Sequence, residues 1–440
     1  MKNNAYQDCL ENIYKLGRFG IKLELDTIVN ILKRLNNPQQ NYHVIHVAGT
    51  NGKGSTATYI ASILQKAGFK TGIYTSPHLV RFNERIAIDG QPISDDAVVA
   101  AYEAVHAADT GKRKATFFEI ATAMGFYYFS KKNVDWAVIE TGMGGRFDAT
   151  NVIQPQVSVI TNLSIEHTAY LGNTIKDLAR EKGGIIKPDT PVITGVSQPS
   201  GLEVLKRIAR ENAADLFVYK QDFSARKDPG RDTYTYKGLI HSFHHLIKPL
   251  PGDHQRENLS LALAACELIF EKFKHKDLRY TLNQAIVREG LAIAKWPGRL
   301  EHVMEKPLVI LDGAHNLHAA KVLATYLSST VNDRRLTLVL GILDDKPYEK
   351  MLKLLVPCAQ QIIITRAKID RSIEPSVLKQ AVQGITATPV TIIDDVKEAV
   401  THAIQTSQPQ DAVCVAGSLY VAGEAKEKFN YDLDQMTKMK

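Results

Sequence analysis

Residues 46–55 constrain the fold of this chain most, because they join an apolar strand to a helix through a glycine-rich turn. The overlapping apolar run, residues 44–48, is typical of a buried strand. The turn brings together glycines, an ammonium and a hydroxyl, and its residues are Gly49, Thr50, Asn51, Gly52, Lys53, Gly54 and Ser55. Backbone N–H groups, a lysine and the positive end of the next helix are groups that bind phosphate oxygens. The turn therefore predicts a binding site for a nucleoside triphosphate.

The turn departs from the general phosphate loop, whose pattern is Gly-x-x-x-x-Gly-Lys-Ser/Thr. Gly54 is inserted between Lys53 and Ser55, and a glycine falls three residues before Gly52 instead of five. A strand-to-helix turn without a ligand would show similar glycines. Such a turn would not need a lysine and a hydroxyl at the start of the helix, so we retain the phosphate site as the interpretation.

The length of 440 residues exceeds what one hydrophobic core usually accommodates, so two domains are expected. Hydrophobic residues make up 44% of the chain and charged residues 23%, which is ordinary for a globular protein and does not indicate disorder. The formal net charge of +7 comes from scattered basic residues, without a basic arm or a zinc pattern. A positive cleft for anionic small molecules explains this charge, and no nucleic-acid partner is expected.

The cysteines lie far apart and fit no metal-binding spacing; they are Cys9, Cys266, Cys358 and Cys414. Free thiols in the reducing cytoplasm are the simplest explanation. The polar N-terminal residues 1–9 lack the apolar core of a secretion signal, and no apolar run is long enough to cross a membrane. We therefore expect a cytoplasmic protein without membrane contact.

Segments typical of strands alternate with amphipathic segments over the first half of the chain. The expected strands cover 44–48, 72–75, 134–140, 157–161 and 191–195, and the expected helices cover 56–67, 94–109, 116–131 and 174–182. This alternation is typical of an α/β domain with a mostly parallel sheet. Short aromatic segments with Lys-Gly and Pro-Gly turns over 217–247 predict a small added antiparallel sheet before a helix at 256–272. Thr116 and Glu119 match a capping box at the start of one helix.

Residues 295–299 contain a Pro-Gly pair that interrupts regular structure, and the alternation then begins again. Strands are expected at 308–312, 336–341, 361–365, 390–393 and 411–416, and helices at 316–329, 347–356, 374–384, 395–406 and 419–429. The sequence therefore predicts a P-loop nucleotide-binding domain over 1–296 and a second, Rossmann-like α/β domain over 297–440. The second domain has no Gly-x-Gly-x-x-Gly fingerprint, so dinucleotide binding is not expected.

Polar residues follow several predicted strands of the first domain, at the edge where an open α/β sheet binds its ligands. Glu140 ends a strand before a glycine-rich loop; it suits Mg²⁺ beside a phosphate loop, although such a residue can also cap a helix. A lone histidine is more often structural, but the same sheet edge favours a metal ligand at His167. Lys182 ends a predicted helix, where complementing the helix dipole is a sufficient role.

Polar residues also gather at the start of the second domain. Asp312 and His315 follow the apolar strand residues Leu308–Leu311, whereas their neighbour Asn316 is also a candidate to cap the next helix. Arg299 lies at the domain break, and its planar guanidinium suits a phosphate group. These residues predict a second polar site.

These clusters, in this order, resemble the folylpolyglutamate synthase and dihydrofolate synthase family of Mur-type ATP-dependent amide ligases. The segments that carry the resemblance run over nearly the whole chain, at 46–55, 75–79, 140–151, 250–258, 297–301, 311–316 and 416–420. The inserted Gly54 is expected in this family. One segment departs from the family pattern, because Glu166 and Ala169 stand where aspartate is usual. This departure does not affect the assignment of His167 as a metal ligand. The substrate contacts that the family makes at the neighbouring positions cannot be carried over to this chain.

The resemblance implies roles for individual residues. Lys53 would hold the β- and γ-phosphates of ATP and Ser55 would ligate one Mg²⁺, while Glu140 and His167 would ligate a second. Lys182 is similar to the lysine that becomes carbamylated in such ligases. Further ATP contacts are implied for Asn258, Arg299, Asp312 and His315, and the folate pocket for Ser76, Pro77, His78, Phe82 and Arg85.

The implied reaction is ATP-dependent addition of L-glutamate to tetrahydrofolate, and dihydropteroate is a further candidate substrate. A carboxylate is a poor electrophile, so transfer of the γ-phosphoryl group first forms an acyl phosphate, which the amine of glutamate attacks. Lys53 and two Mg²⁺ ions would neutralise the charge on the transferring group. The expected catalytic residues are Lys53, Lys182 and His315. We expect the second domain to hold glutamate and the protein to be a monomer.

Two other functions fit parts of the pattern. A nucleotide-switched binding protein explains the phosphate loop but leaves Asp312 and His315 without a role. A Mur-type ligase acting on another carboxylate, such as a UDP-linked peptide, shares the chemistry. It is disfavoured because the phosphate loop begins near residue 49, which leaves no separate N-terminal UDP-binding domain.

Overall fold

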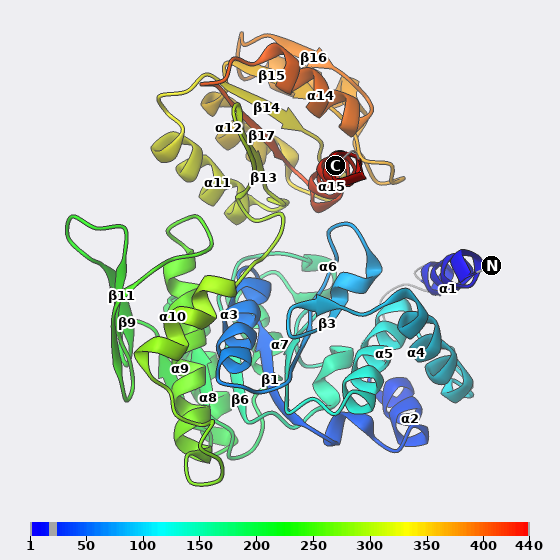
Figure 1. Ribbon diagram of the computed structural model, residues 1–440, viewed down its shortest axis with the longest axis vertical. Coiled ribbons are helices and arrows are strands. Elements are labelled where there is room, and N and C mark those ends of the chain that lie inside the picture. The colour runs from blue at the N-terminus through cyan, green and yellow to red at the C-terminus, as the bar shows by residue number, and fades with distance from the viewer. Residues whose placement is uncertain (1, 17–23, 439–440) are drawn as a thin grey trace. The chain divides into compact units, whose positions relative to one another are not determined.

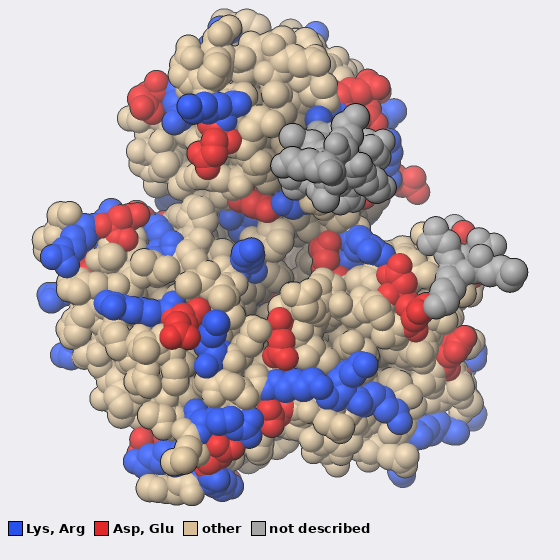
Figure 2. All heavy atoms as spheres, viewed as in Figure 1, with Lys and Arg blue, Asp and Glu red and all other residues tan. Residues whose placement is uncertain are grey.

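The computed structural model describes residues 2–16 and 24–438. Its internal contacts divide the chain into two compact units, Met1–Pro249 with Gln255–Lys295 and Leu250–His254 with Trp296–Lys440. Each unit has its own sheet and its own hydrophobic core. On the face drawn in Figure 2, Lys and Arg side chains are interspersed with Asp and Glu, in line with the scattered basic residues of the sequence.

The first unit is built on an eight-stranded sheet with the order β4-β3-β2-β5-β1-β6-β7-β8. Its strands are β1 His43–Ala48, β2 Thr71–Tyr74, β3 Ile86–Ile88, β4 Gln91–Pro92, β5 Trp136–Glu140, β6 Val157–Ile160, β7 Val192–Thr194 and β8 Leu216–Val218. The strands run parallel except for β3 and β4, which form an antiparallel edge. The predicted α/β fold with a mostly parallel sheet is confirmed. Because β1 lies between β5 and β6, the carboxyl ends of these three strands meet at one edge.

Helices surround this sheet (Figure 1). They are α1 Lys2–Lys15, α2 Asp26–Arg34, α3 Lys53–Lys66, α4 Asp95–Ala108, α5 Phe117–Lys131, α6 Thr168–Leu171, α7 Ile175–Gly183, α8 Pro199–Glu211, α9 Gln255–Phe273 and α10 Gln284–Ile293, with 3-10 turns at Pro38–Gln40, Phe82–Arg85 and Ala149–Val152. α3 packs against α9 and α10, whereas α5 packs against α1, α2 and α4. The capping box predicted at the start of α5 is confirmed, because Thr116 Oγ1 accepts from the Glu119 N–H at 3.3 Å and Glu119 Oε2 accepts from the Thr116 N–H at 2.8 Å.

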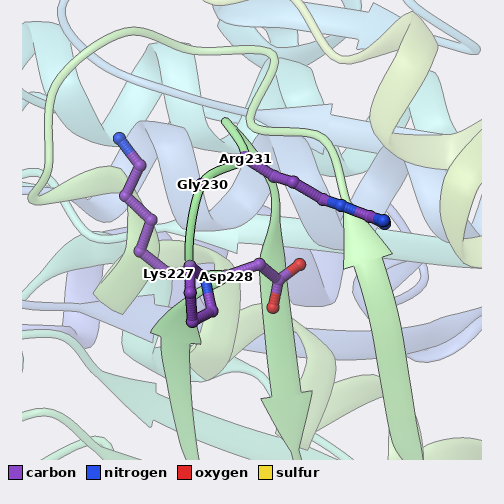
Figure 3. A pocket seen from close by; sticks show the side chains of 5 residues that line it. Lys227, Asp228, Gly230 and Arg231 are labelled. Carbon is purple, nitrogen blue, oxygen red and sulfur yellow. The ribbon is translucent and has the colours of Figure 1, made fainter.

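A small antiparallel sheet with the order β11-β10-β9 packs against α9 through β9; its strands are β9 Ser224–Lys227, β10 Tyr234–Lys237 and β11 Ser242–Leu246. The sequence-based expectation placed this sheet over 217–247. The structure differs at β8, which joins the large sheet because it pairs in parallel with β7. Figure 3 shows the turn between β9 and β10, which lines a shallow pocket that contains none of the predicted site residues; the lining residues are Lys227, Asp228, Pro229, Gly230 and Arg231.

The second unit contains a six-stranded sheet with the order β12-β13-β17-β14-β15-β16. Its strands are β12 Glu301–Glu305, β13 Leu308–Leu311, β14 Leu336–Leu340, β15 Gln361–Ile364, β16 Val390–Ile392 and β17 Ala412–Ala416. β12 is antiparallel to β13, and the other pairs are parallel. The helices are α11 Leu317–Thr330, α12 Tyr348–Leu355, α13 Pro375–Gln383, α14 Val396–Thr406 and α15 Leu419–Lys438, with a 3-10 turn at Val356–Cys358. The alternation of strands and helices predicted after residue 299 is confirmed. The structure contains one further strand, β12, at the edge of the sheet.

Candidate active site

Close packing around two glycines determines the path of the phosphate loop. β1 ends at Ala48 and α3 begins at Lys53, with Gly52 as the N-cap in the left-handed region at φ +82°. A Cβ atom on Gly52 would lie 2.3 Å from Asn258 Oδ1, and one on Gly49 would lie 1.8 Å from Thr161 Oγ1. Any larger residue would collide at either position, so this tight turn requires glycine.

The loop is also tied to the segment that follows β6. The Thr50 N–H donates to Asn162 O at 3.0 Å, and the Asn51 N–H donates to Asn162 Oδ1 at 3.0 Å. Thr161 Oγ1 donates to Asn51 O at 2.7 Å. Thr50 and Asn51 therefore use their backbone N–H groups to hold the loop in place.

The backbone N–H groups suited to bind phosphate lie after Thr50 and Asn51, at the start of α3. The first helical hydrogen bond of α3 runs from the Thr56 N–H to Gly52 O at 2.9 Å. The N–H groups of Lys53, Gly54 and Ser55 precede this bond at the positive end of the helix, where phosphate oxygens bind.

Lys53 lies over the loop and connects it to β5. Its Nζ donates to Gly49 O at 3.1 Å and to Thr50 O at 3.2 Å, and lies 3.9 Å from Glu140 Oε1. Glu140 is 4% exposed at the carboxyl end of β5, and its Oε2 accepts from the Ser76 N–H at 3.1 Å. A short chain of contacts therefore leads from the phosphate loop through Glu140 to the predicted folate segment.

The first turn of α9 brings Asn258 to the loop. Gln255 Nε2 donates to Ser55 Oγ at 3.3 Å, and Gln255 Oε1 accepts from Asn258 Nδ2 at 2.9 Å. All three side chains are buried. The Ser55 hydroxyl lies at the start of α3, where the hydroxyl of a phosphate loop ligates Mg²⁺.

Lys182 is buried against the phosphate loop. The residue is 1% exposed, and its Nζ donates to Gly49 O at 2.9 Å and lies 3.6 Å from Glu166 Oε1. Burial lowers the pKa of Lys182 to about 8, although the Glu166 carboxylate favours the charged form. The sequence alone allowed a helix-dipole role for this lysine, but the structure places its amine at the loop.

His167 is the N-cap residue of α6, with an exposed side chain and a left-handed backbone at φ +49°. The described residues contain no group of three or more His, Cys, Asp or Glu side chains placed to hold a metal ion. Ser55 and Glu140 offer oxygen ligands beside the loop, and Mg²⁺ takes its remaining ligands from phosphate oxygens and water. These two residues therefore fit a Mg²⁺ that is bound with the nucleotide, and the role of His167 in the site stays a prediction.

The predicted folate segment follows β2. Its Ser76–Pro77 peptide bond is cis, and Arg85 Nε donates to His78 Nδ1 at 2.8 Å. Arg85 is 6% exposed, and its guanidinium lies 6.0 Å from the centre of the Phe82 ring. Burial and the nearby Arg85 charge lower the pKa of His78 to about 3, so its imidazole is neutral near pH 7. The structure thus joins His78, Phe82 and Arg85 in one cluster.

Three residues beside this segment were missed by the sequence analysis. The Arg85 guanidinium lies 5.0 Å from the centre of the Phe117 ring. A Cβ atom on Gly142 would lie 2.4 Å from Phe118 Cζ, so that glycine allows the ring to pack against the loop after β5. Asp148 is buried in the same loop, and burial raises its pKa. Two sequence features could have pointed to these residues. The capping box places both phenylalanines at the start of α5, and the glycines after β5 mark the loop that contains Asp148.

In the second unit, the predicted residues gather at the carboxyl end of β13. Asp312 is 8% exposed and accepts from the N–H groups of Leu300 and Ala314, each at 2.9 Å. Burial raises the pKa of Asp312, and the Arg299 charge opposes that rise. His315 Nδ1 lies 2.8 Å from a backbone carbonyl oxygen of the same turn. The structure therefore brings Arg299, Asp312 and His315 to one strand end.

Two domain families match the sequence. Residues 47–266 match the Mur ligase middle domain, and residues 298–419 match the Mur ligase glutamate ligase domain. Together with the phosphate loop, these matches define an ATP-dependent ligase of the Mur type.

Two relatives and a solved structure narrow the class. The chain is 36% identical to the dihydrofolate synthase/folylpolyglutamate synthase of Bacillus subtilis, over 96% of this chain and 99% of the relative, and 35% identical to the folylpolyglutamate synthase of Lacticaseibacillus casei, over 96% and 98%. A structure of the Mycobacterium tuberculosis folylpolyglutamate synthase complexed with ADP matches with a TM-score of 0.89 and 32% identity, over 98% of this chain and 99% of that one. The chain belongs to the folylpolyglutamate synthase and dihydrofolate synthase family.

Membership of this family makes the chain an ATP-dependent ligase that uses Mg²⁺. The alternative of a nucleotide-switched binding protein is therefore set aside. Within the described residues, no helix has the length and apolar character needed to cross a membrane.

Proposed function

We propose that this ligase adds L-glutamate to tetrahydrofolate through an acyl-phosphate intermediate, with dihydropteroate as the alternative acceptor. The observation that carries the proposal is the contact chain in which Glu140 lies 3.9 Å from Lys53 Nζ and accepts from the Ser76 N–H at 3.1 Å. This chain joins the phosphate loop to the folate segment, so the γ-phosphate and the acceptor carboxylate have binding groups on adjacent strand ends.

The proposed reaction has two steps. A carboxylate oxygen of the folate attacks the γ-phosphorus of ATP, the bond to ADP breaks, and an acyl phosphate forms. The glutamate amine then attacks the acyl carbon, inorganic phosphate leaves, and the amine loses a proton as the amide forms. In the first step, the ammonium of Lys53 and the N–H groups at the start of α3 stabilise the charge on the transferring phosphoryl group.

The metal would be held beside the same loop. Ser55 and Glu140 would supply oxygen ligands and His167 a nitrogen ligand to Mg²⁺, with two ions in the complete site. Bound Mg²⁺ supplies charge neutralisation on the phosphates. From the second domain, we propose that Arg299, Asp312 and His315 contact the nucleotide and that the unit binds glutamate.

The domain roles follow the same proposal. Residues 1–296 would form the ATP-binding domain and residues 297–440 the glutamate ligase domain. We propose that the protein is a monomer and that it lies in the cytoplasm. Sedimentation of the purified chain would test the oligomeric state, and a stable dimer would contradict the proposed monomer.

The proposed function is tested by ADP release in the presence of Mg²⁺, glutamate and either tetrahydrofolate or dihydropteroate. We expect release to require both the acceptor and glutamate, and product masses to increase by one glutamyl residue per turnover. Lys53→Ala should lower the rate by more than about 100-fold, because a preorganised charge at the phosphoryl group is lost. Lys66→Ala, at the exposed far end of α3, is the matched control and should leave the rate unchanged. Full activity of Lys53→Ala, or ADP release without an acceptor, would contradict the proposal.

A further inference from the structure

The α1 helix carries an aromatic ring, that of Tyr14, which is partly exposed. On this helix Tyr6, Cys9 and Ile13 are 5%, 4% and 0% exposed and belong to the hydrophobic core of the first unit. They follow a helical spacing and form the stripe that faces α4 and α5. Tyr14 lies outside this core cluster and remains 45% exposed.

The exposed ring of Tyr14 lies against the residues of the folate segment. It stacks on Phe117 with ring centres 5.8 Å apart and an interplanar angle of 17°, and its centre is 6.4 Å from the His78 ring. Phe117 in turn meets Phe82 edge to face at 6.3 Å. The rings of Tyr14, His78 and Phe82 therefore gather around Phe117, the first residue of α5.

A buried cation lies within this aromatic cluster. The Arg85 guanidinium is 5.0 Å from the centre of the Phe117 ring, and Arg85 Nε donates to His78 Nδ1 at 2.8 Å. Arg85 is 6% exposed, whereas Tyr14 is 45% exposed, so the cluster combines an accessible flat ring with a fixed positive charge. A flat aromatic molecule that carries carboxylates complements both features.

We propose that Tyr14 is a wall of the acceptor site and contacts the flat pteridine or aminobenzoyl ring of the substrate. This inference rests on the proposed function, since it assigns the acceptor ring to the cluster around His78. Tyr14 thereby makes α1 part of the active site, although this helix lies before the phosphate loop and outside both matched domain families.

The test compares Tyr14→Leu with Tyr14→Phe in the full chain. The folate KM and the Kd for the pteridine acceptor, measured by its fluorescence, should both rise about 3- to 10-fold in Tyr14→Leu, because a stacked aromatic contact is lost. Tyr14→Phe should keep both constants within about twofold of the unsubstituted protein, because it retains the ring. The KM values for ATP and glutamate should stay unchanged in both variants.

Tyr102→Leu is the matched control, because Tyr102 also stacks on a neighbouring ring, that of His106 at 5.3 Å, but on α4. Its folate constants should remain those of the unsubstituted protein. Unchanged folate constants in Tyr14→Leu would overturn this inference. A rise in Tyr14→Phe or Tyr102→Leu as large as that in Tyr14→Leu would overturn it as well. In either case, folate-dependent turnover by the unsubstituted protein would still support the proposed function. Absence of that turnover would overturn the proposed function and this inference with it.

Discussion

At the scale of single residues, the amines of Lys53 and Lys182 both lie at the phosphate loop, and each is close to a carboxylate. Both amines donate to Gly49 O, at 3.1 Å and 2.9 Å, and each lies near one carboxylate, Glu140 for Lys53 and Glu166 for Lys182. The buried carboxylate and amine groups at this loop are thus paired, which offsets the cost of removing them from water.

Lys182 carries a testable prediction. Its pKa of about 8 leaves a substantial fraction of neutral amine near pH 8, and the neutral amine is the form that reacts with CO₂ to form a carbamate. With ¹³C-labelled bicarbonate, we expect one carbamate resonance that grows between about pH 7 and pH 8 as the amine deprotonates. Carbamylation would replace the ammonium that faces Glu166 by an anion, so this contact must open when the group forms.

The control for this prediction is Lys187, whose amine is also partly buried and donates to Asn151 O at 3.1 Å. Burial lowers its pKa as well. Lys182→Met should abolish the carbamate resonance and the ligase activity, whereas Lys187→Met should retain both. A protein without the resonance, or a resonance that survives in Lys182→Met, would show that Lys182 is not carbamylated.

At the scale of elements, one buried carboxylate attaches the small antiparallel sheet to α9. Glu267 is 1% exposed on that helix and accepts from the Tyr236 hydroxyl at 2.9 Å and from the Leu239 and His241 N–H groups at 2.8 Å and 2.6 Å. A Cβ atom on Gly238 would lie 2.4 Å from this carboxylate, so the glycine lets the turn close around it. The turn between β10 and β11 therefore depends on a residue far along the chain.

Glu267→Ala should lower the free energy of unfolding by about 3 kcal/mol, because the buried Tyr236 hydroxyl and two partly buried N–H groups lose their shared acceptor at once. Urea unfolding measures this change, and hydrogen exchange should speed up at the amides of Leu239 and His241. Glu271→Ala, one turn later on α9, removes only a surface pair with Lys274 and should cost less than about 1 kcal/mol. Equal stability of the two variants would contradict the structural role given to Glu267.

Elements differed in how far the sequence predicted them. Several long strands and helices, such as β1, β14 and α5, appear where they were expected, whereas the helix α8 was not among those expected. Short elements such as β3 and β4 were missed, because two or three residues carry too little pattern to be recognised. β8 was assigned to the wrong sheet for a different reason: its pairing with β7 depends on a partner that local pattern does not reveal.

At the scale of the whole molecule, the two units have separate hydrophobic cores. In the second unit the buried side chains of β13, β14, β15 and β17 fill both faces of the sheet, with Leu338 in one core cluster and Val339 in the other. The sheet is complete within residues 301–416. A domain with its own sheet and two filled faces is expected to fold alone.

Residues 296–440, produced as a separate chain, should therefore unfold cooperatively in urea with the circular dichroism of an α/β domain. A nonhydrolysable ATP analogue should shift the midpoint of this fragment less than that of the full chain, because the phosphate loop belongs to the other unit and only the proposed contacts of Arg299, Asp312 and His315 remain. Leu338→Asp, at a position that is 0% exposed, is the destabilised control. A fragment without a cooperative transition would show that residues 296–440 need Leu250–His254 or the first unit to fold.

The sequence by itself determined the phosphate loop, the α/β alternation and the polar residues at strand ends, because each depends on neighbours within a few positions. Only the tertiary structure decided that Lys182 reaches Gly49 across 133 positions, that Glu267 holds the small sheet, and that Tyr14 stacks on Phe117. These contacts follow from the order of strands and the packing of helices, which local periodicity does not specify.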